Sequence, residues 1–201
     1  MLRKQLRPAI LMTLVLCVVT GFIYPGVVTG LAQLIFPRQA NGSLVTVNGH
    51  VVGSALIGQP FARPEYFHPR PSAAGSGYDA SASSGTNKGP TDAKLADTLI
   101  MQAVDSAVKN DGARKGEIPS DMVTSSASGL DPHISPANAY LQVARVARAR
   151  GVDSTAVRAL LDRRVDGRQF GFFGEPRVNV LLLNIAVDSV FGVPKTLAPA
   201  K

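Results

Sequence analysis

The sequence predicts an α+β protein with one N-terminal transmembrane helix followed by a single extracytoplasmic domain that holds a β-hairpin and about four helices. Three observations lead to this prediction: an uncharged apolar run over residues 8–37, two β-rich segments around an Asn-Gly turn, and capped helical patterns in the second half. The chain has 201 residues, enough for one globular domain and a short appendage. Its single cysteine excludes an intramolecular disulfide framework.

The N-terminal run has the length of a membrane-spanning helix. We assign residues 9–36 to it, because about 20 apolar residues cross a hydrocarbon core of roughly 30 Å. Lys and Arg accumulate on the cytoplasmic side of membrane helices, so we expect residues 1–8 to form a cytoplasmic tail and residues 37–201 an extracytoplasmic domain. The basic residues before the run are Arg3, Lys4 and Arg7, and only Arg38 follows it closely.

A cleaved signal peptide is the alternative to a retained helix. Gly30 and Ala32 lie at a conceivable cleavage position, and the chain would then be a released extracytoplasmic binding or envelope protein. Retention is favoured because apolar side chains continue through residues 34–36, where a short polar stretch would be expected.

Two residue types inside the run bear on helix packing. Pro25 is expected to kink the helix, which neighbouring helices can tolerate in a membrane. Gly21, Gly26 and Gly30 offer small surfaces of the kind that lets helices approach closely. The same glycines also fit the general composition of membrane helices, and both interpretations stand.

The remaining elements are predicted from turn and cap residues. A polar break over residues 39–43 precedes a β-hairpin, because two β-rich runs flank Asn48-Gly49, the strongest short hairpin signal. Helices are placed from their N-cap residues and from terminal glycines. In order, we expect strands over residues 44–47 and 50–57, a helix from Thr91 or Asp92 to about Gly112, a short strand over residues 118–124, a helix from Pro136 to Arg150 capped by Ser135, a helix from Ser154 to about Arg164 capped by Asp153, and a buried helix over residues 178–190.

Residues 58–90 are rich in Pro, Gly and Ser, but part of this region has the composition of an ordered loop. Residues 63–71 combine the aromatic side chains of Tyr66 and Phe67 with rigid prolines, which is typical of a surface loop that carries function. A phosphate-binding loop is not supported, because Lys88 is followed by Gly and no Gly directly precedes it.

The helix after residue 135 carries a polar face. Asn138, Gln142 and Arg145 recur at intervals of four and three residues, so they share one side of the helix.

Nucleic acid is not an expected partner. Without the three N-terminal basic residues, 18 Lys and Arg stand against 14 Asp and Glu, which leaves only +4 of the formal net charge of +7.

Ser128, Asp131 and His133 supply the side-chain types of nucleophilic hydrolysis. They lie within six residues beside Pro132, and no G-x-S-x-G elbow presents the serine. We therefore expect no catalytic site, with Asp131 ordering the loop and His133 packing near the start of the next helix. Three His and one Cys provide no ligand set for structural zinc, so no metal site is expected.

Six longer motifs follow one another along the chain, and together their order is highly specific for one protein family. They are Ala40-Asn41-Gly42-Ser43-Leu44, Gly53-Ser54-x-Leu56-Ile57-Gly58-Gln59-x-Phe61, Tyr66-Phe67-x-x-Arg70-Pro71-Ser72-Ala73, Ser128-Gly129-Leu130-Asp131-Pro132-His133-Ile134-Ser135-Pro136, Gln142-x-x-Arg145-Val146-Ala147-x-Ala149-Arg150-Gly151 and Glu175-Pro176-Arg177-Val178-Asn179-Val180-Leu181. From the membrane helix to about residue 192, the chain resembles the C-subunit family of the Kdp-type potassium-transporting P-type ATPase (KdpC family). Thr86 and Asp92 depart from the family pattern, where Ser and Asn are expected.

The resemblance implies an accessory subunit of a high-affinity, ATP-driven potassium uptake complex in the bacterial inner membrane. Its implied partners are a potassium-channel-like subunit, a P-type ATPase catalytic subunit and membrane lipid. ATP and K+ would be handled by the complex, and no cofactor is expected on this chain. The role attributed to the family is chaperone-like, raising the ATP affinity of the catalytic subunit. The chain has neither an Asp-Lys-Thr-Gly phosphorylation motif nor a Walker sequence, as expected of a non-catalytic subunit.

We expect partner contacts from both the helix and the outer domain. As a hypothesis, the helix docks against the other subunits and the outer domain sits over the potassium entrance, which would give mechanical support. The candidate contact residues are Gly21, Pro25, Gly30 and Gln33 in the helix, Tyr66, Phe67, Arg70 and Asn87 in the Pro-rich region, and Asp131, His133, Asn138, Gln142 and Arg145 in the second half.

Overall fold

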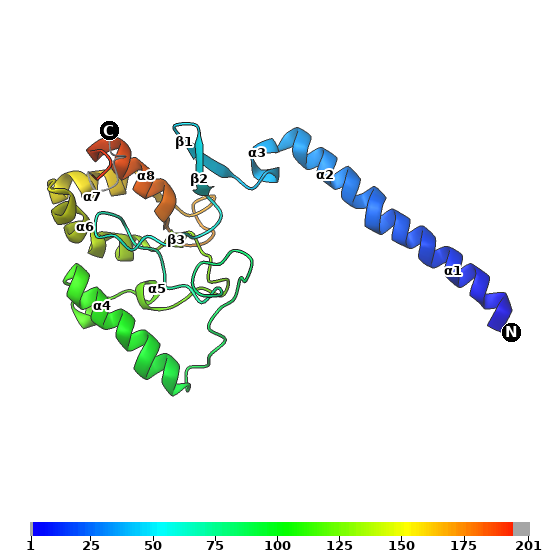
Figure 1. Cartoon of the computed structure of the whole chain (residues 1–201), viewed down its shortest axis with the longest axis horizontal. Coiled ribbons are helices and arrows are strands. Elements are labelled where there is room, and N and C mark those ends of the chain that lie inside the picture. The colour runs from blue at the N-terminus through cyan, green and yellow to red at the C-terminus, as the bar shows by residue number, and fades with distance from the viewer. Residues whose placement is uncertain (1, 195–201) are drawn as a thin grey trace. The chain divides into compact units, whose positions relative to one another are not determined.

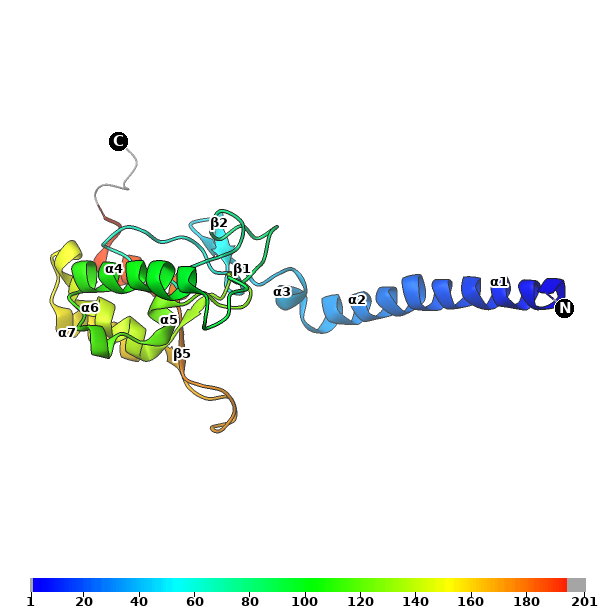
Figure 2. The same ribbon diagram turned by 90° about the horizontal axis from the view of Figure 1, so that it is seen from below.

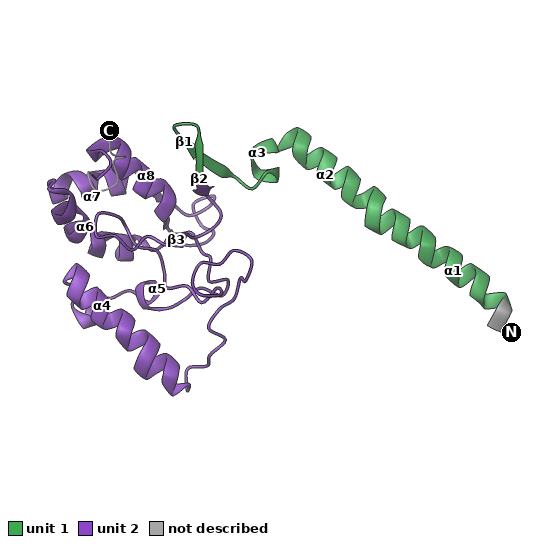
Figure 3. Cartoon of the chain, viewed as in Figure 1, with its two compact units in different colours: residues 1–52 green, residues 53–201 purple. Residues whose placement is uncertain are grey.

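The computed structural model describes residues 2–194, and the chain divides into two compact units, residues 1–52 and residues 53–201 (Figure 3). The predicted α+β class is confirmed. The described residues contain one N-terminal apolar helix, a β-hairpin and several further helices with a small sheet (Figure 1).

Unit 1 begins with a long helical segment. It comprises α1 (Leu2–Val18), the π-helical turn η1 (Val19–Ile23) and α2 (Tyr24–Ile35). Its apolar part, Lys4–Ile35, has 32 residues and a length of about 48 Å, and none of it is buried within the protein. Among the described residues, this is the one helix long and apolar enough to cross a membrane.

The π-helical turn η1 lies directly before Pro25. A proline inside a helix donates no hydrogen bond, and its ring collides with the carbonyl four residues earlier, here that of Gly21. The wider π turn relieves this crowding, and the N–H of Tyr24 donates to the carbonyl of Val19, five residues back. The predicted disturbance at Pro25 therefore takes the form of a π turn within a continuing helix.

The predicted hairpin is confirmed, but its second strand ends three residues earlier than expected, because residues 55–57 turn back and the N–H of Ile57 donates to the carbonyl of Ser54. After one helical turn, α3 (Pro37–Ala40), which occupies the start of the predicted polar break, β1 (Leu44–Val47) pairs with β2 (His50–Ser54). Asn48 and Gly49 both adopt positive φ, 50° and 81°, as a two-residue type I′ turn requires.

Unit 2 combines helices with a three-stranded antiparallel sheet in the order β3-β5-β4. The predicted caps are confirmed, because Asp92 accepts the N–H of Leu95 at 3.0 Å, Ser135 that of Asn138 at 3.1 Å, and Asp153 that of Thr155 at 3.1 Å. The elements are η2 (Lys94–Ile100), α4 (Met101–Asp111), η3 (Lys115–Glu117), α5 (Ser120–Val123), β3 (His133–Ile134), α6 (Pro136–Arg150), α7 (Ser154–Asp162), β4 (Val165–Asp166), β5 (Arg177–Asn179) and α8 (Val180–Phe191).

Two further sequence-based assignments, both in unit 2, were wrong. The strand expected over residues 118–124 is instead the short helix α5, which follows Pro119 and closes with a bond from Thr124 N–H to the carbonyl of Ser120. The final helix starts two residues later than expected. Val178 belongs to β5, where it pairs with both Ile134 and Val165, so it cannot be helical, and the helix begins only after the strand ends at Asn179.

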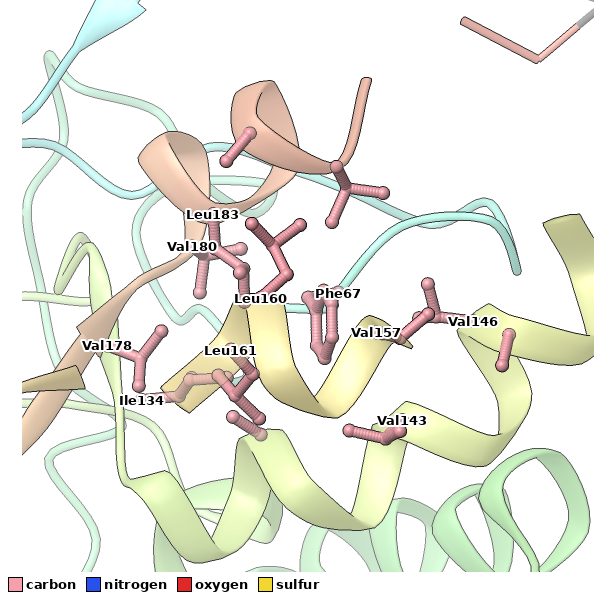
Figure 4. Close-up of a cluster of buried hydrophobic side chains, with 14 residues drawn as sticks. Phe67, Ile134, Val143, Val146, Val157, Leu160, Leu161, Val178, Val180 and Leu183 are labelled. Atoms are coloured by element: carbon pink, nitrogen blue, oxygen red, sulfur yellow. The ribbon is translucent and has the colours of Figure 1, made fainter. Parts of the chain in front are cut away.

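The core of unit 2 surrounds Phe67, which is fully buried (Figure 4). This ring comes from the Pro-rich loop, and apolar side chains of α6, α7 and α8 pack around it. Full burial of one phenylalanine contributes about 1.5–3 kcal/mol, so the loop is an integral part of the core. The principal core side chains are Ile134, Val143, Val146, Val157, Leu160, Leu161, Val178, Val180, Leu183 and Val187.

Gly129 and Gly151 form a matched pair for a test of close packing. Both have a φ of 66°, but a Cβ on Gly129 would lie 2.5 Å from the carbonyl oxygen of Ser84 and 2.7 Å from the backbone nitrogen of Ala74, whereas one on Gly151 meets nothing within 4 Å. Gly129→Ala should lower the free energy of unfolding by about 2–5 kcal/mol, and Gly151→Ala by only about 1–2 kcal/mol. Thermal unfolding of the full chain in detergent, followed by circular dichroism, measures both; equal losses would refute the packing argument.

Candidate functional site

The loop of residues 63–70 is held in place by side chains rather than by neighbouring strands. The carbonyl oxygens of five consecutive residues, 64–68, each accept a hydrogen bond from a side chain. Backbone groups inside a protein require such partners, and an irregular segment has no strand to supply them. The donors are Gln142, Arg145 and Arg150 on α6 and Asn184 on α8, and we call these four residues the loop clamp.

The side-chain carboxamides of Asn184 and Gln142 each bind the backbone N–H and the backbone carbonyl of one loop residue. Asn184 accepts the N–H of Phe67 at 2.8 Å and donates to its carbonyl at 2.9 Å. Gln142 accepts the N–H of His68 at 2.7 Å and donates to its carbonyl at 3.1 Å. Both amide residues are only 1% exposed. A carboxamide carries a donor beside an acceptor, so it can replace the two hydrogen bonds that a neighbouring strand would make.

Arg145 joins the loop to α4 through a buried ion pair. Its Nε donates to Asp111 at 2.7 Å, and the two side chains are 6% and 5% exposed. One terminal nitrogen donates to the carbonyls of Pro64 and Tyr66 at 2.7 and 2.8 Å, and the other to Gln142 at 2.6 Å. The planar guanidinium can serve all four acceptors at once, which a lysine could not do.

Asn138 extends this network to the start of α6. Asp121 in α5 accepts hydrogen bonds from the backbone N–H and the hydroxyl of Ser135 and, at 3.0 Å, from Asn138. Asn138 in turn accepts from Gln142 at 2.8 Å. Asn138, Gln142 and Arg145 thus share one face, as predicted, but this face is buried and contacts the chain's own loop.

Tyr66 is a loop residue whose side chain contacts Arg150 of the loop clamp. Its hydroxyl donates to Asp188 at 3.0 Å, and Asp188 also accepts from Arg150 at 2.7 Å. The Arg150 guanidinium lies over the Tyr66 ring, 5.0 Å from its centre. Burial, together with the Asp188 carboxylate, raises the pKa of the Tyr66 hydroxyl. Tyr66 and Phe67 therefore anchor the loop internally from two sides.

A second cluster joins the other end of the loop to the segment before α6. Arg70 donates to Asp131 at 3.2 Å, and its carbonyl accepts from the Tyr78 hydroxyl at 2.6 Å. Burial of the Asp131 carboxyl acts to raise its pKa, but hydrogen bonds from His133 and the charge of Arg70 outweigh this, and the pKa lies below its usual value. Asp131 accepts the backbone N–H of His133 at 2.9 Å, which confirms its predicted role in ordering this segment.

Ser128 takes part in a different set of contacts. Its hydroxyl accepts the N–H of Leu130 at 3.1 Å and lies 3.3 Å from the hydroxyl of Ser126. No hydrogen bond connects Ser128 with His133 in the described part of the chain. The geometry of a nucleophile beside its base is therefore not formed by these residues.

The other candidate contact residues are not part of the loop clamp. Gly21 is in η1, and Pro25 and Gly30 are in α2, all exposed. Gln33 exchanges two hydrogen bonds with Asn41, of 3.1 and 3.3 Å, which ties the end of α2 to the segment after α3. Asn87 is exposed in unit 2, has a positive φ of 53° and bonds to Ser84 at 3.4 Å.

Three of the residues that hold the loop were not predicted from the sequence: Asn184, Arg150 and Asp111. A signal for Asn184 was present, since it is the one polar residue in the apolar stretch of residues 180–187. A hollow of about 400 Å³ beside the loop is lined in part by His68 and Asp111. Among residues 2–194, no group of three His, Cys, Asp or Glu side chains could hold a metal ion. The arrangement therefore immobilises a loop.

Comparison with known proteins gives consistent matches over nearly the whole chain. A family model described as KdpC, the c chain of the K+-transporting ATPase, matches residues 6–189. A relative from Gemmatimonas aurantiaca is 61% identical over 188 residues, covering 93% of this chain and 94% of the relative. A relative from Koribacter versatilis is 55% identical over 193 residues (96% and 98%), and one from Myxococcus xanthus 58% over 183 residues (90% and 86%). All three relatives carry the name potassium-transporting ATPase KdpC subunit.

Arg145 and Arg148 provide a matched test of the loop clamp, since both lie on α6 but only Arg145 is buried. Arg145→Ala leaves the buried carboxylate of Asp111 without its cation and should lower the free energy of unfolding by about 3–5 kcal/mol. Arg148→Ala should change it by about 0.5 kcal/mol or less. Denaturant unfolding of the full chain in detergent measures both values, and a loss for Arg145→Ala no larger than that for the control would contradict the role of the clamp.

His68 should make the stability of unit 2 depend on pH. Burial, with the nearby charge of Arg145, lowers the pKa of His68 in the folded chain, while its Nε2 bonds to the carbonyl of Arg63. The unfolded chain therefore takes up the proton first, and the free energy of unfolding should fall as the pH falls from about 7 to about 5. His68→Gln retains an N–H donor but does not titrate, so its stability should depend less on pH across that window. Identical pH profiles for both proteins would show the expectation to be wrong.

Proposed function

The chain belongs to the KdpC family of K+-transporting ATPase c chains, and we propose that it is the single-span accessory subunit that stabilises such a complex and supports its ATP-driven potassium import. The observation that carries the proposal is the match over nearly the full chain, combined with one helix long enough to cross a membrane. The proposed partners are the potassium-channel-like subunit and the P-type ATPase catalytic subunit.

The proposed orientation follows from the charges that flank the helix. Basic residues precede the apolar run, which favours a cytoplasmic N-terminus and an extracytoplasmic unit 2. Nucleotide lies on the cytoplasmic side, so only residues 1–8 and the inner end of the helix are on the same side as ATP. An effect of this chain on ATP affinity, the role attributed to the family, would then be transmitted through helix contacts with the catalytic subunit rather than through unit 2.

The loop clamp supports a mechanical role for unit 2. Binding through a mobile loop costs conformational entropy, whereas a loop fixed in advance avoids that cost. The buried residues Tyr66, Phe67 and Gln142 would act by positioning the loop. The exposed loop residue Pro64, together with the exposed Ala62 just before the loop, would be free to contact a partner. We place this fixed surface over the potassium entrance of the channel-like subunit, where a rigid cover stabilises the assembly.

The test is to co-express the tagged full chain with the other subunits of its own ATPase, next to a version that ends after residue 52 and keeps the helix. The full chain should co-purify with the partners and support growth at limiting potassium, and the shortened chain should lose both properties. Arg148→Ala, a surface change on α6, serves as the control for expression. The KM for ATP, measured with and without the full chain, tests whether this chain raises the ATP affinity of the catalytic subunit. That role requires a several-fold lower KM when the chain is present. Intact assembly and uptake with the shortened chain would refute the proposed support by unit 2.

A further inference from the structure

The hairpin between α7 and α8 ends in three exposed aromatic side chains. Gln169 and Phe173 exchange two backbone hydrogen bonds of 2.9 Å and close the tip. Phe170, Phe172 and Phe173 are 80%, 65% and 58% exposed, and the rings of Phe172 and Phe173 lie 4.2 Å apart. The tip projects from the body of unit 2, beyond β5 in Figure 2. Three phenylalanines together in water are an unusual surface for a soluble domain and indicate a contact site.

The tip is carried on a fixed base. Val178 of β5 is fully buried in the core and lies opposite Val165 of β4, so the two strands root the hairpin in unit 2. Arg168 and Glu175 form an ion pair of 2.8 Å between the base and the tip. The aromatic side chains are therefore held away from the core and cannot fold back into it without breaking these pairings.

Exposed arginines surround the base of the hairpin. Over residues 163–178 there are four Arg against one Asp and one Glu, which leaves a charge of +2. An apolar tip above a cationic base matches a lipid surface, where anionic headgroups lie over hydrocarbon. The arginines are Arg163, Arg164, Arg168 and Arg177, all exposed.

The exposed apolar area of the tip favours a lipid bilayer over a protein as its binding partner. With about 200 Å² per phenylalanine, the three side chains expose roughly 400 Å². A stable protein interface buries about 800 Å² on each partner, so the tip alone is too small for one. A bilayer needs no pocket that matches the tip. The helix of this chain also keeps unit 2 near the bilayer, because residues 36–52, which join the end of α2 to unit 2, span at most about 60 Å when fully extended.

We propose that the tip of residues 170–173 inserts into the surface of the membrane that the helix of this chain spans. The protein then has a second membrane contact besides its helix. This contact limits the rotation of unit 2 about residues 36–52. The proposal requires only that the helix is retained in the bilayer, and it holds whether or not the other subunits are present.

The chain has no tryptophan, so Phe172→Trp gives a single fluorescent reporter at the tip. The full chain is placed in nanodiscs of phosphatidylethanolamine and phosphatidylglycerol. Its emission should be blue-shifted and should lose most of its intensity when the acyl chains are brominated. Val190→Trp provides the control. Val190 is 60% exposed near the end of α8, and its reporter should emit as in water and keep its intensity with brominated lipid.

Three outcomes would overturn the proposal. A Phe172→Trp reporter that emits as in water in the nanodisc excludes lipid insertion. A reporter that shifts only after the other ATPase subunits are added, without quenching by brominated lipid, assigns the tip to a protein partner. Equal quenching at positions 172 and 190 shows a general approach of unit 2 to the bilayer rather than insertion of the tip. Circular dichroism of both variants checks that the fold is retained.

Discussion

Unit 2 depends on one constraint, which is that a stretch of irregular main chain must be buried. Phe67 occupies the centre of the core, and it brings the carbonyl groups of its neighbours inside with it. Each buried polar group without a partner costs about 1–3 kcal/mol. The hydrogen bonds to the carbonyls of Tyr66 and Phe67 are buried and those to the other three carbonyls are partly buried, so leaving all five unpaired would remove a large part of the stability of a typical domain. The loop clamp removes this cost with side chains from α6 and α8, so the loop is held by both helices.

The features predicted correctly from the sequence are those that depend on neighbouring residues. The caps Ser135 and Asp153 and the Asn48-Gly49 turn each act within three residues of themselves, so their identity is enough to place them. The sheet β3-β5-β4 and the loop clamp join distant segments, as in the bond between Asn184 and Phe67, 117 residues apart. No local pattern contains that information.

Periodicity explains both the success and the limit of the prediction for α6. The spacing of Asn138, Gln142 and Arg145 correctly placed them on one face, because helical geometry alone determines which residues align. What lies opposite that face is a tertiary property. A polar helix face is usually expected to contact water or a partner protein. Here it contacts the backbone of the chain's own loop, whose N–H and carbonyl groups also need hydrogen-bond partners.

The short path between β5 and the loop clamp has a mechanical consequence. Asn179 ends β5 and caps α8, and Asn184, only five residues further, holds Phe67. A lateral load on the hairpin is thus carried in shear along the β5 pairings and then along the axis of α8, both stiff directions of the backbone. A displacement of the hairpin would therefore also displace the start of α8 and, through Asn184, the buried loop around Phe67.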